Sequence, residues 1–340
     1  MNHRSHAWFI VLPPDGAARE AGLETAASFE SILGPDGCKI FDSKKYLDFF
    51  SGKLRNPDEN LVVDLVNHAL AVQCLDFRAA NMLVCALSPV TLFTLNLLRA
   101  HYVATHHWFY EDFRKTAYWK FVLTGYDRFF AIQKGPLAEF CSKYGSTYYF
   151  LPTAAARSCC LPYGGPVMPD RARDVAFIGI PTAYRIEILE HLASAGLSLS
   201  IAGLGWDRYT GPLSPMIENG VWTDASQAAG LLKNAKVGIN LSADAPDADR
   251  ENTHISPRVF DVLASGCTLI TENVPLAHQT LKGLHYHTFT NKITAAQVTQ
   301  AILSDFERET ALCLTNRAIV CQDHTFINRA KTIIQTAGDR

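Results

Sequence analysis

The stretch THISPRVFDVLASGCTLIT, residues 253–271, combines a helix start with a charged side chain that could hold an anion. Ser256 is a strong N-cap residue, Pro257 suits the first helical position, and Gly266 suits the left-handed residue that ends a helix. The open N-terminus of such a helix presents unpaired backbone N–H groups and the positive end of its dipole, with Arg258 nearby. We therefore expect an anionic ligand to bind at this helix start.

Three other loops in the second half of the chain follow predicted strand ends. GIPTAYR places Arg185 at a helix start, where a cation can meet a diphosphate. AGLGW supplies Gly203 and Gly205, which permit close approach of the backbone. In NGVWTD, the backbone near Val221 and Trp222 could pair with the edge of a base. Because loops after parallel strands converge at one edge of a sheet, the four loops together predict a nucleotide-diphosphate site.

Each of these loops also admits a purely structural explanation. An arginine early in a helix is often a solvated surface residue, and AGLGW lacks the GxGxxG fingerprint of dinucleotide-binding loops. Asp261 lies one turn into its helix and could simply pair with Arg258. The order and spacing of the loops along the chain favour the functional interpretation.

The elements that must position these loops alternate between strands and helices. Strand-like runs in the first half are AWFIVLPP, NMLVCAL, YVATHHW, DRFFAIQ and TYYFLP; those in the second half are DVAFIGI, LSLSIAGLG, KVGINL and TLIT. Helical segments separate them, which is typical of a parallel sheet with helices on both faces. The sequence thus predicts an α/β protein with two doubly wound, Rossmann-like domains and a ligand in the cleft between them.

The stretch TAAARSCCLPYGGPVMPDRARD interrupts this alternation with prolines, glycines and small residues. We therefore expect an N-terminal domain over residues 1–155, a linker over 156–173 and a C-terminal domain over 174–315. Residues 316–340 are expected to form a helical segment that packs back toward the N-terminal domain.

Composition excludes several classes of function. The chain has 340 residues, of which 48% are hydrophobic and 19% charged, as in a globular protein of two domains. The formal net charge of −2 gives no basic field for nucleic acid or an anionic membrane. Nine cysteines without zinc-ligand spacing indicate reduced, mostly buried thiols.

No targeting or membrane-spanning segment is expected. The N-terminus MNHRSHAWFIVLPPDG has no long apolar core before its prolines. The apolar window AANMLVCALSPVTLFTLNLL is interrupted by polar residues and reads better as a buried strand followed by a helix. These features favour a cytoplasmic location.

Several blocks of the sequence together resemble one protein family. In the second half these are DVAFIG, ILEHLASAGLSLSIAGLGW, INL, RVFDVLASGCTLIT and DHTFINRAKTI; in the first half they are LSPVTLFTLNLLRAHYVATHHWFYEDFR, YDRFFAIQK and YYFLPTAA. Their order is similar to that of the CgeB-like glycosyltransferases, which have the GT-B fold and a C-terminal domain like that of group 1 glycosyl transferases. The resemblance covers most of residues 80–335 and is most specific at RVFDVLASG.

The resemblance implies a glycosyltransferase that needs no metal and whose C-terminal domain binds a UDP-, GDP- or dTDP-linked sugar. Arg185 and Arg258 would neutralise the diphosphate, and Asp261 would accept hydrogen bonds from the ribose hydroxyls. The other residues assigned to the donor site are Gly203, Gly205, Trp206, Val221, Trp222, Asn240, Ser256 and Val259. The chain departs from related transferases at Asp261, where they usually carry Glu, and at Thr253, where many carry a second Glu.

The acceptor and any catalytic base are expected in the N-terminal half, in the loop THHWFYEDFR, facing the donor across the cleft. Aromatic side chains there could stack on a sugar, and an inverting transfer needs a base near the acceptor hydroxyl. We rank Asp112 first, Glu111 second and His107 third. Alternatively, the aromatics form core and the acids pair with Arg114 and Lys115. A retaining reaction would need no such base, and the sequence leaves both outcomes open.

An acidic run, SADAPDADRE, could present Asp244, Asp247 and Asp249 to a hard cation. It lacks a calcium-loop pattern, so we interpret it as a solvated loop and predict no metal ligands.

Two other classes of function compete with glycosyl transfer: a nucleotide-sugar epimerase or phosphorylase on the same plan, and a sugar-nucleotide-binding protein without catalysis. The acceptor could be a glycan, a lipid-linked glycan or a protein. The oligomeric state cannot be read from the sequence.

Overall fold

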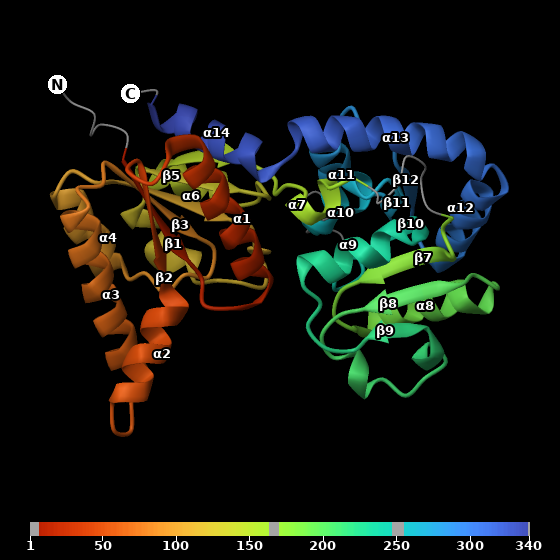
Figure 1. Ribbon diagram of the computed structural model, residues 1–340, viewed down its shortest axis with the longest axis horizontal. Helices are drawn as coiled ribbons and strands as arrows, with labels where there is room; N and C mark the ends of the chain where they lie inside the picture. Colours follow the sequence, from red (N-terminus) through yellow and green to blue (C-terminus); the bar gives the residue numbers. More distant parts are fainter. Residues whose placement is uncertain (1–6, 163–169, 247–254, 339–340) are drawn as a thin grey trace. The chain divides into compact units, whose positions relative to one another are not determined.

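The computed structural model describes residues 7–162, 170–246 and 255–338, which form two compact units (Figure 1). Unit 1 contains the chain up to Thr153 together with the segment from Phe326 onward, and unit 2 runs from Ala154 to Thr325. Each unit is built on a six-stranded parallel sheet.

Unit 1 alternates strands and helices and is completed by the C-terminal helix α14. Its elements are β1 (Trp8–Leu12), α1 (Gly16–Leu33), β2 (Cys38–Asp42), α2 (Ser43–Lys53), α3 (Glu59–Asp76), β3 (Asn81–Cys85), α4 (Leu92–Ala100), β4 (Ala104–Phe109), α5 (Trp119–Val122), the short 3₁₀ turn η1 (Leu123–Gly125), β5 (Arg128–Ala131), α6 (Leu137–Lys143), β6 (Thr147–Phe150) and α14 (Phe326–Gly338).

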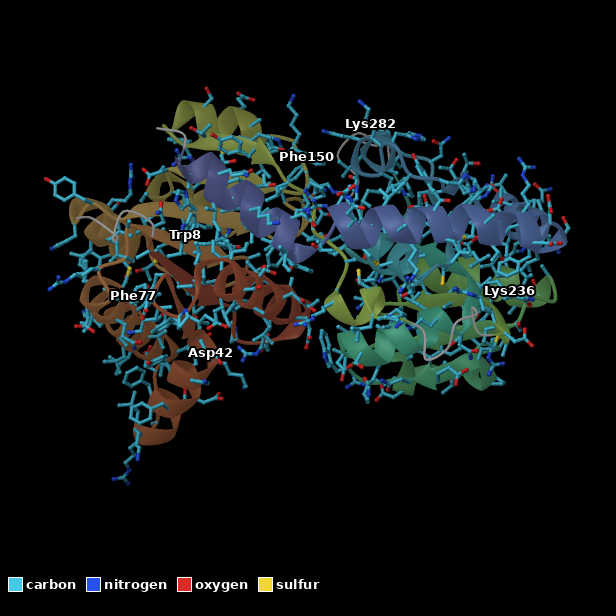
Figure 2. The ribbon with its side chains drawn as sticks, turned by 45° about the horizontal axis from the view of Figure 1, so that its top comes forward. Trp8, Asp42, Phe77, Phe150, Lys236 and Lys282 are labelled. Atoms are coloured by element: carbon cyan, nitrogen blue, oxygen red, sulfur yellow. The ribbon has the colours of Figure 1, made fainter. Side chains whose placement is uncertain are left out.

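The sheet of unit 1 has the order β2-β1-β3-β4-β5-β6, and both of its faces are covered by helices. On one face, Trp8 lies 5.0 Å from Phe29 of α1, and Trp108 lies 6.0 Å from Phe326 of α14 (ring centroids). Trp8 is labelled in Figure 2 and is 1% exposed. The opposite face forms a core with α3, α4 and α6. Helix α14 therefore belongs structurally to unit 1, although unit 2 precedes it in the chain.

Unit 2 repeats the same alternation. Its elements are α7 (Arg157–Cys160), β7 (Arg173–Ile178), α8 (Ala183–Ser194), β8 (Leu199–Ala202), η2 (Trp206–Arg208), η3 (Ser214–Met216), β9 (Ile217–Asn219), α9 (Ala225–Lys233), β10 (Ala235–Asn240), α10 (Arg258–Ala264), β11 (Thr268–Glu272), α11 (Pro275–Thr280), β12 (His287–Phe289), α12 (Lys292–Ser304) and α13 (Phe306–Asp323).

The sheet of unit 2 has the order β9-β8-β7-β10-β11-β12, which is the Rossmann order with its switch point between β7 and β10. Helices α8 and α12 share a core with one face of the sheet. Helix α10 packs on the other face, where a Cβ at Gly238 would lie 2.5 Å from the Val262 side chain. The prediction of an α/β protein with two doubly wound, Rossmann-like domains is confirmed.

The strands form where they do because they are buried on both faces. Most positions in β1, β3, β7 and β10 are buried, as expected for parallel strands that read as continuous apolar runs. Local signals set the helix ends: Thr182 caps α8 through the N–H of Arg185, and Asp224 forms a capping box at the start of α9.

The unit borders of the structure differ in detail from the expected domain limits. Helix α7 and the start of β7 lie in unit 2, within the stretch expected to be a linker, of which residues 163–169 are outside the described part. The expected limit at residue 315 falls inside α13. None of the helices in the described ranges combines the length and apolar character needed to cross a membrane.

Candidate functional site

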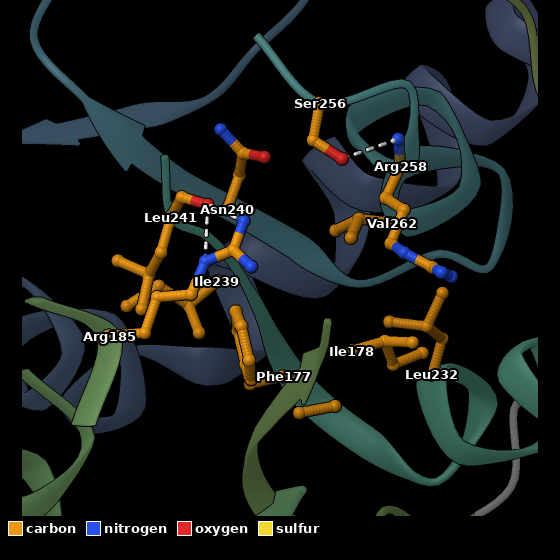
Figure 3. Close-up of a pocket in the computed structure, with 11 residues that line it drawn as sticks. Phe177, Ile178, Arg185, Leu232, Ile239, Asn240, Leu241, Ser256, Arg258 and Val262 are labelled. Carbon is orange, nitrogen blue, oxygen red and sulfur yellow. Dashed lines mark hydrogen bonds between the residues drawn. The ribbon is translucent and has the colours of Figure 1, made fainter. Parts of the chain in front are cut away.

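The switch point of unit 2 brings together four residues that the sequence predicts for a nucleotide diphosphate. Arg185, Asn240, Ser256 and Arg258 line a cavity at the carboxyl ends of β7 and β10 (Figure 3). Its volume is about 20 Å³, room for about one water molecule. A diphosphate could therefore enter only if the arginine side chains moved.

Arg185 lies near the start of α8 and is held by backbone oxygens. Its guanidinium lies 5.5 Å from the ring centroid of Phe177. The guanidinium donates to the carbonyl of Leu241 at 2.9 Å and to that of Ile180 at 3.0 Å (Figure 3 draws a bond to Leu241). Burial lowers the pKa of this guanidinium, and the nearby carboxylate of Glu272 opposes the effect. A phosphate is a stronger acceptor than these carbonyls because it is charged.

The start of α10 is shifted by one residue from the prediction. Pro257 already has helical φ and ψ of −50° and −28° and occupies the N-cap position, so the helix begins at Arg258. The Ser256 hydroxyl accepts from the Arg258 N–H at 3.3 Å, and Gly266 has the predicted left-handed φ of 70°. Burial lowers the pKa of the Arg258 guanidinium, while Asp261 opposes the effect.

Asp261 has a different partner from the one that the resemblance implies. Its Oδ1 accepts a hydrogen bond from the backbone N–H of Ala156 at 2.7 Å. Ala156 is the N-cap residue of α7, so the carboxylate of Asp261 ties α10 to α7 within unit 2. The second departure from the family pattern, Thr253, lies outside the described residues. The contact with Ala156 uses one oxygen of the carboxylate, so the role of Asp261 as a ribose ligand stays a prediction.

The AGLGW loop is shaped by internal packing. Gly203 has φ of 142°, and a Cβ there would lie 2.3 Å from the carbonyl oxygen of Gly179. Trp206 is 1% exposed and donates from Nε1 to the same oxygen at 2.7 Å. Gly205 has φ of 98°, so its conformation also requires glycine. Trp206 and the fully buried Val259 are therefore core side chains, and a ligand could meet only their backbone.

The predicted base-binding residues lie beside a larger hollow. Val221 and Trp222 are 55% and 39% exposed and line a volume of about 490 Å³ next to β9 and α9. Their backbone groups are engaged by Asn219, whose Oδ1 accepts from the Val221 N–H at 3.1 Å and whose Nδ2 donates to the Trp222 carbonyl at 3.2 Å. A nucleotide base in this hollow would therefore contact the exposed side chain of Trp222 more readily than these two backbone groups.

The sequence interpretation missed Glu272, the last residue of β11. Its side chain is 2% exposed; Oε1 accepts from the Ser242 N–H, and Oε2 is buried with no hydrogen-bond partner in the described structure. Burial raises the pKa of Glu272 to about 7. With Tyr184 and Lys292, Glu272 lines a hollow of about 340 Å³. A glutamate at the end of an apolar strand, TLITEN, was the available sequence signal.

The acidic run between β10 and α10 is only partly described. Asp244 is exposed, whereas Asp247 and Asp249 lie outside the described residues. The structure therefore gives no geometry for this run as a whole.

In unit 1, THHWF belongs to the strand β4, as the strand-like run YVATHHW predicts, so the loop expected at THHWFYEDFR begins only after Phe109. His107 is fully buried in this strand, and its ring nitrogens bond to the Val84 carbonyl at 2.8 Å and the Tyr118 hydroxyl at 3.0 Å. Burial lowers the pKa of His107 to about 3. The side chain is part of the core because β4 is a central strand with helices on both faces. We therefore do not retain His107 as a candidate base.

The loop after β4 carries the two candidate carboxylates. Asp112 is 6% exposed and forms an ion pair with Arg114, with Nη2 to Oδ2 at 2.7 Å. This matches the structural alternative for Asp112. Glu111 is partly buried, and burial, followed by the charge of Asp112, raises its pKa to about 7. A carboxylate with this pKa is suited to accept a proton near neutral pH.

Comparison with known proteins is consistent with this geometry. Residues 185–335 match the family described as glycosyl transferase-like, so the chain carries a glycosyltransferase-like domain. Among curated proteins, no sequence relative matches the chain.

Solved structures share the fold over the whole chain. A glycosyltransferase from Rickettsia africae ESF-5 has a TM-score of 0.64 at 12% identity and is covered completely, as is this chain. Anabaena Alr3699/HepE in complex with UDP-glucose has a TM-score of 0.63 at 10% identity, covering 98% of this chain and 100% of that one. A Listeria monocytogenes protein assigned as a UDP-N-acetylglucosamine 2-epimerase has a TM-score of 0.60 at 9% identity, covering 98% and 95%. The fold is that of GT-B glycosyltransferases.

Proposed function

We propose that the protein transfers a sugar from a nucleotide-diphosphate-sugar donor to an acceptor hydroxyl, and that it belongs to the CgeB-like group. The observation that carries the proposal is the pair of arginines, Arg185 and Arg258, on one cavity at the switch point of a Rossmann-ordered sheet. The glycosyl transferase-like match over residues 185–335 includes both arginines.

The three hollows of unit 2 follow the carboxyl edge of its sheet in an order that suits such a donor. The hollow at Trp222 adjoins β9, the arginine cavity lies at β7 and β10, and the hollow at Glu272 adjoins β11 and β12. We assign the base, the diphosphate and the sugar to them in this order. Strands lie about 4.8 Å apart, and four to five spacings separate β9 from β11 and β12, so the outer hollows lie roughly 19–24 Å apart along this edge.

The proposed chemistry uses side chains of this chain without a metal at the diphosphate. Negative charge develops on the leaving nucleoside diphosphate, and two guanidinium groups beside the start of α10 stabilise it. In an inverting reaction Glu111 would take the proton of the acceptor hydroxyl. We place Glu111 above Asp112 because the carboxylate of Asp112 is already paired with Arg114.

A panel of UDP, GDP and dTDP in thermal unfolding identifies the base, since a ligand that binds the native state raises the melting temperature. HepE is a neighbour seen with UDP-glucose, so UDP is tested first. Incubation of the matching nucleotide sugar with glycan, lipid-linked and peptide acceptors should then release nucleoside diphosphate only when an acceptor is present.

The epimerase-like neighbour motivates the second candidate function. An epimerase would act on the nucleotide sugar without an acceptor and without forming a new glycosidic bond. Mass spectrometry of the glycoside and chromatography of the nucleotide sugar separate the two reactions. Binding with no product of either kind would favour a non-catalytic binding protein.

Arg258→Ala tests the proposed donor site directly. Loss of a charge-assisted hydrogen bond should weaken nucleoside-diphosphate binding by about 1.5–3 kcal/mol. The matched control is Arg308→Ala on α13, where the arginine is exposed. Equal dissociation constants for wild type and Arg258→Ala in calorimetry would remove this arginine from the site.

A further inference from the structure

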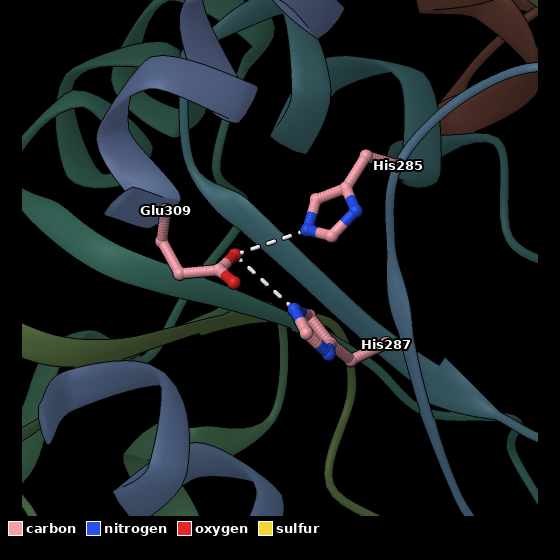
Figure 4. Close-up of side chains that lie close together, drawn as sticks. All are labelled: His285, His287 and Glu309. Atoms are coloured by element: carbon pink, nitrogen blue, oxygen red, sulfur yellow. Dashed lines mark hydrogen bonds and ion pairs between the residues drawn. The ribbon is translucent and has the colours of Figure 1, made fainter. Parts of the chain in front are cut away.

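Two histidines and one glutamate converge in unit 2, away from the cavities described above. His285 and His287 each place Nε2 at 3.1 Å from Oε2 of Glu309 (Figure 4). All three atoms lie within 4.8 Å of one another. The imidazole rings stand nearly perpendicular, at 86°, with centroids 4.9 Å apart. The three side chains thus place three potential metal-ligand atoms around one small space.

We propose that His285, His287 and Glu309 bind one divalent transition-metal ion of the Zn²⁺ type. Two imidazole nitrogens and one carboxylate oxygen are a donor set that suits Zn²⁺ and related borderline cations better than Mg²⁺ or Ca²⁺. Three protein ligands leave at least one coordination position for water.

The backbone holds these ligands in place. His285 and His287 are separated by one residue at the start of β12, and alternate residues of an extended chain point to the same side. Asn316 of α13 bonds to the backbone of His285 in both directions: Oδ1 accepts from its N–H at 2.9 Å, and Nδ2 donates to its carbonyl at 2.6 Å. Glu309 lies two turns before Asn316 on the same helix. The two elements that carry the ligands are therefore already fixed to each other.

The distances and exposures suit a metal ion. Ligand atoms bound to tetrahedral Zn²⁺ at about 2.0–2.1 Å lie roughly 3.3 Å apart, a few tenths of an ångström more than the N–O separations here. The Glu309 side chain is 10% exposed, while those of His285 and His287 are 33% and 30% exposed. The site is thus anchored by a nearly buried carboxylate and open to solvent on the imidazole side, through which an ion and its water can enter.

The hydrogen bonds between Glu309 and the two histidines occupy the atoms that a metal ion would bind. A hydrogen-bonded cluster without metal would hold a proton on each Nε2, and a metal ion would replace both of these protons.

The site would lie apart from the donor groups. His285 and His287 lie at the amino end of β12, whereas the donor groups follow the carboxyl ends of their strands. A bound ion would tie β12 to α13 without touching the diphosphate, and nucleotide affinity should not depend on it.

The test uses the full chain without a histidine tag, freed of metal by a chelator that is then removed. We expect calorimetry with ZnCl₂ to show one ion per chain and thermal unfolding to move upward with Zn²⁺. His287→Ala and Glu309→Gln should each weaken binding at least tenfold. His278→Ala is the matched control, because His278 is an exposed histidine that bonds to Tyr286, outside the three-ligand cluster.

Co²⁺ substitution keeps the test decisive if a variant fails to fold. The wild-type protein should show visible d–d bands of nitrogen- and oxygen-bound Co²⁺. An intense near-ultraviolet thiolate band would instead assign binding to cysteine and overturn the proposal. It would equally be overturned if the wild type took up no Zn²⁺, or if both ligand variants bound it as tightly as the wild type.

Discussion

At the scale of single residues, the loop after β4 contains a carboxyl group with a raised pKa, that of Glu111. Its pKa of about 7, raised by burial and by Asp112, predicts that turnover rises with pH through about 7, because the base must be ionised. Glu111→Gln should lower turnover by about 10²- to 10⁴-fold with nucleotide affinity unchanged. Steady-state kinetics between pH 5.5 and 8.5 and calorimetry measure both.

Asp112→Asn is the comparison for Glu111→Gln. It removes the charge that pairs with Arg114 and should lower the free energy of unfolding by about 1–3 kcal/mol. The anomeric configuration of the product shows whether the reaction is inverting, and only an inverting reaction needs this base. If an inverting enzyme kept its turnover in Glu111→Gln, the base would have to be another residue.

Glu272 gives a prediction about stability. Burial raises its pKa from 4.5 to about 7, so between these values the folded chain holds a proton that the unfolded chain has released. The free energy of unfolding therefore falls as pH rises from about 4.5 to 7, by up to about 3 kcal/mol. Glu272→Gln should remove this loss. The difference in free energy of unfolding between the variant and the wild type should therefore favour the variant more at pH 8 than at pH 5. Urea unfolding at both pH values measures it, with Glu187→Gln at an exposed ion pair as control.

At the scale of elements, Gly238 of β10 positions α10, and with it Arg258. A Cβ at this position would lie 2.5–2.7 Å from the Val262 methyl groups, so Gly238→Ala must push α10 away from the sheet. We expect a loss of about 1–3 kcal/mol in the free energy of unfolding, the usual cost of overpacking. Gly230→Ala in α9 meets nothing within 4 Å and should be neutral or stabilising by up to about 1 kcal/mol. Chemical denaturation of the two variants compares them.

The same scale shows what the sequence could predict. Buried parallel strands read as apolar runs and caps mark helix starts, so the alternation of elements and the cavity of Arg185 and Arg258 were predictable. The polar side chains of His106 and His107 made THHWFYEDFR a candidate for the catalytic loop, but both lie buried in β4, where they bond to Asn81 and Val84. These partners lie more than 20 residues away in the chain, and spacing along the sequence does not reveal such contacts.

The partners of Asp261 and Glu309 show the same limit. Asp261 bonds to Ala156, 105 residues away, and Glu309 bonds to His285, 24 residues away. Spacing along the sequence therefore shows neither the contact between Asp261 and Ala156 nor the cluster of Glu309 with the two histidines. A local pattern shows which element carries a side chain, whereas the fold decides which element that side chain meets.

At the scale of the whole molecule, the chain leaves unit 1 after Thr153 and returns to it at Phe326. Ala155 and Thr325 form a parallel bridge, and the Ala155 N–H donates to the His324 carbonyl at 2.9 Å, so the two ends of unit 2 are joined. We expect residues 154–325 to fold when expressed alone, with one cooperative unfolding transition and retained nucleotide binding. A non-cooperative transition in circular dichroism would show that unit 2 depends on unit 1.

Helix α14 sets an order of events on the ribosome. Its Phe326 packs against Trp108 on the sheet of unit 1, yet it is translated only after every residue of unit 2. While unit 2 emerges, α1 already packs on this face through Phe29, but the part around Trp108 lacks the helix that later covers it. The second unit of the chain to be synthesised is therefore the first that can complete its fold, the reverse of the usual N-to-C order, and the nascent first unit is the part that a chaperone must shield.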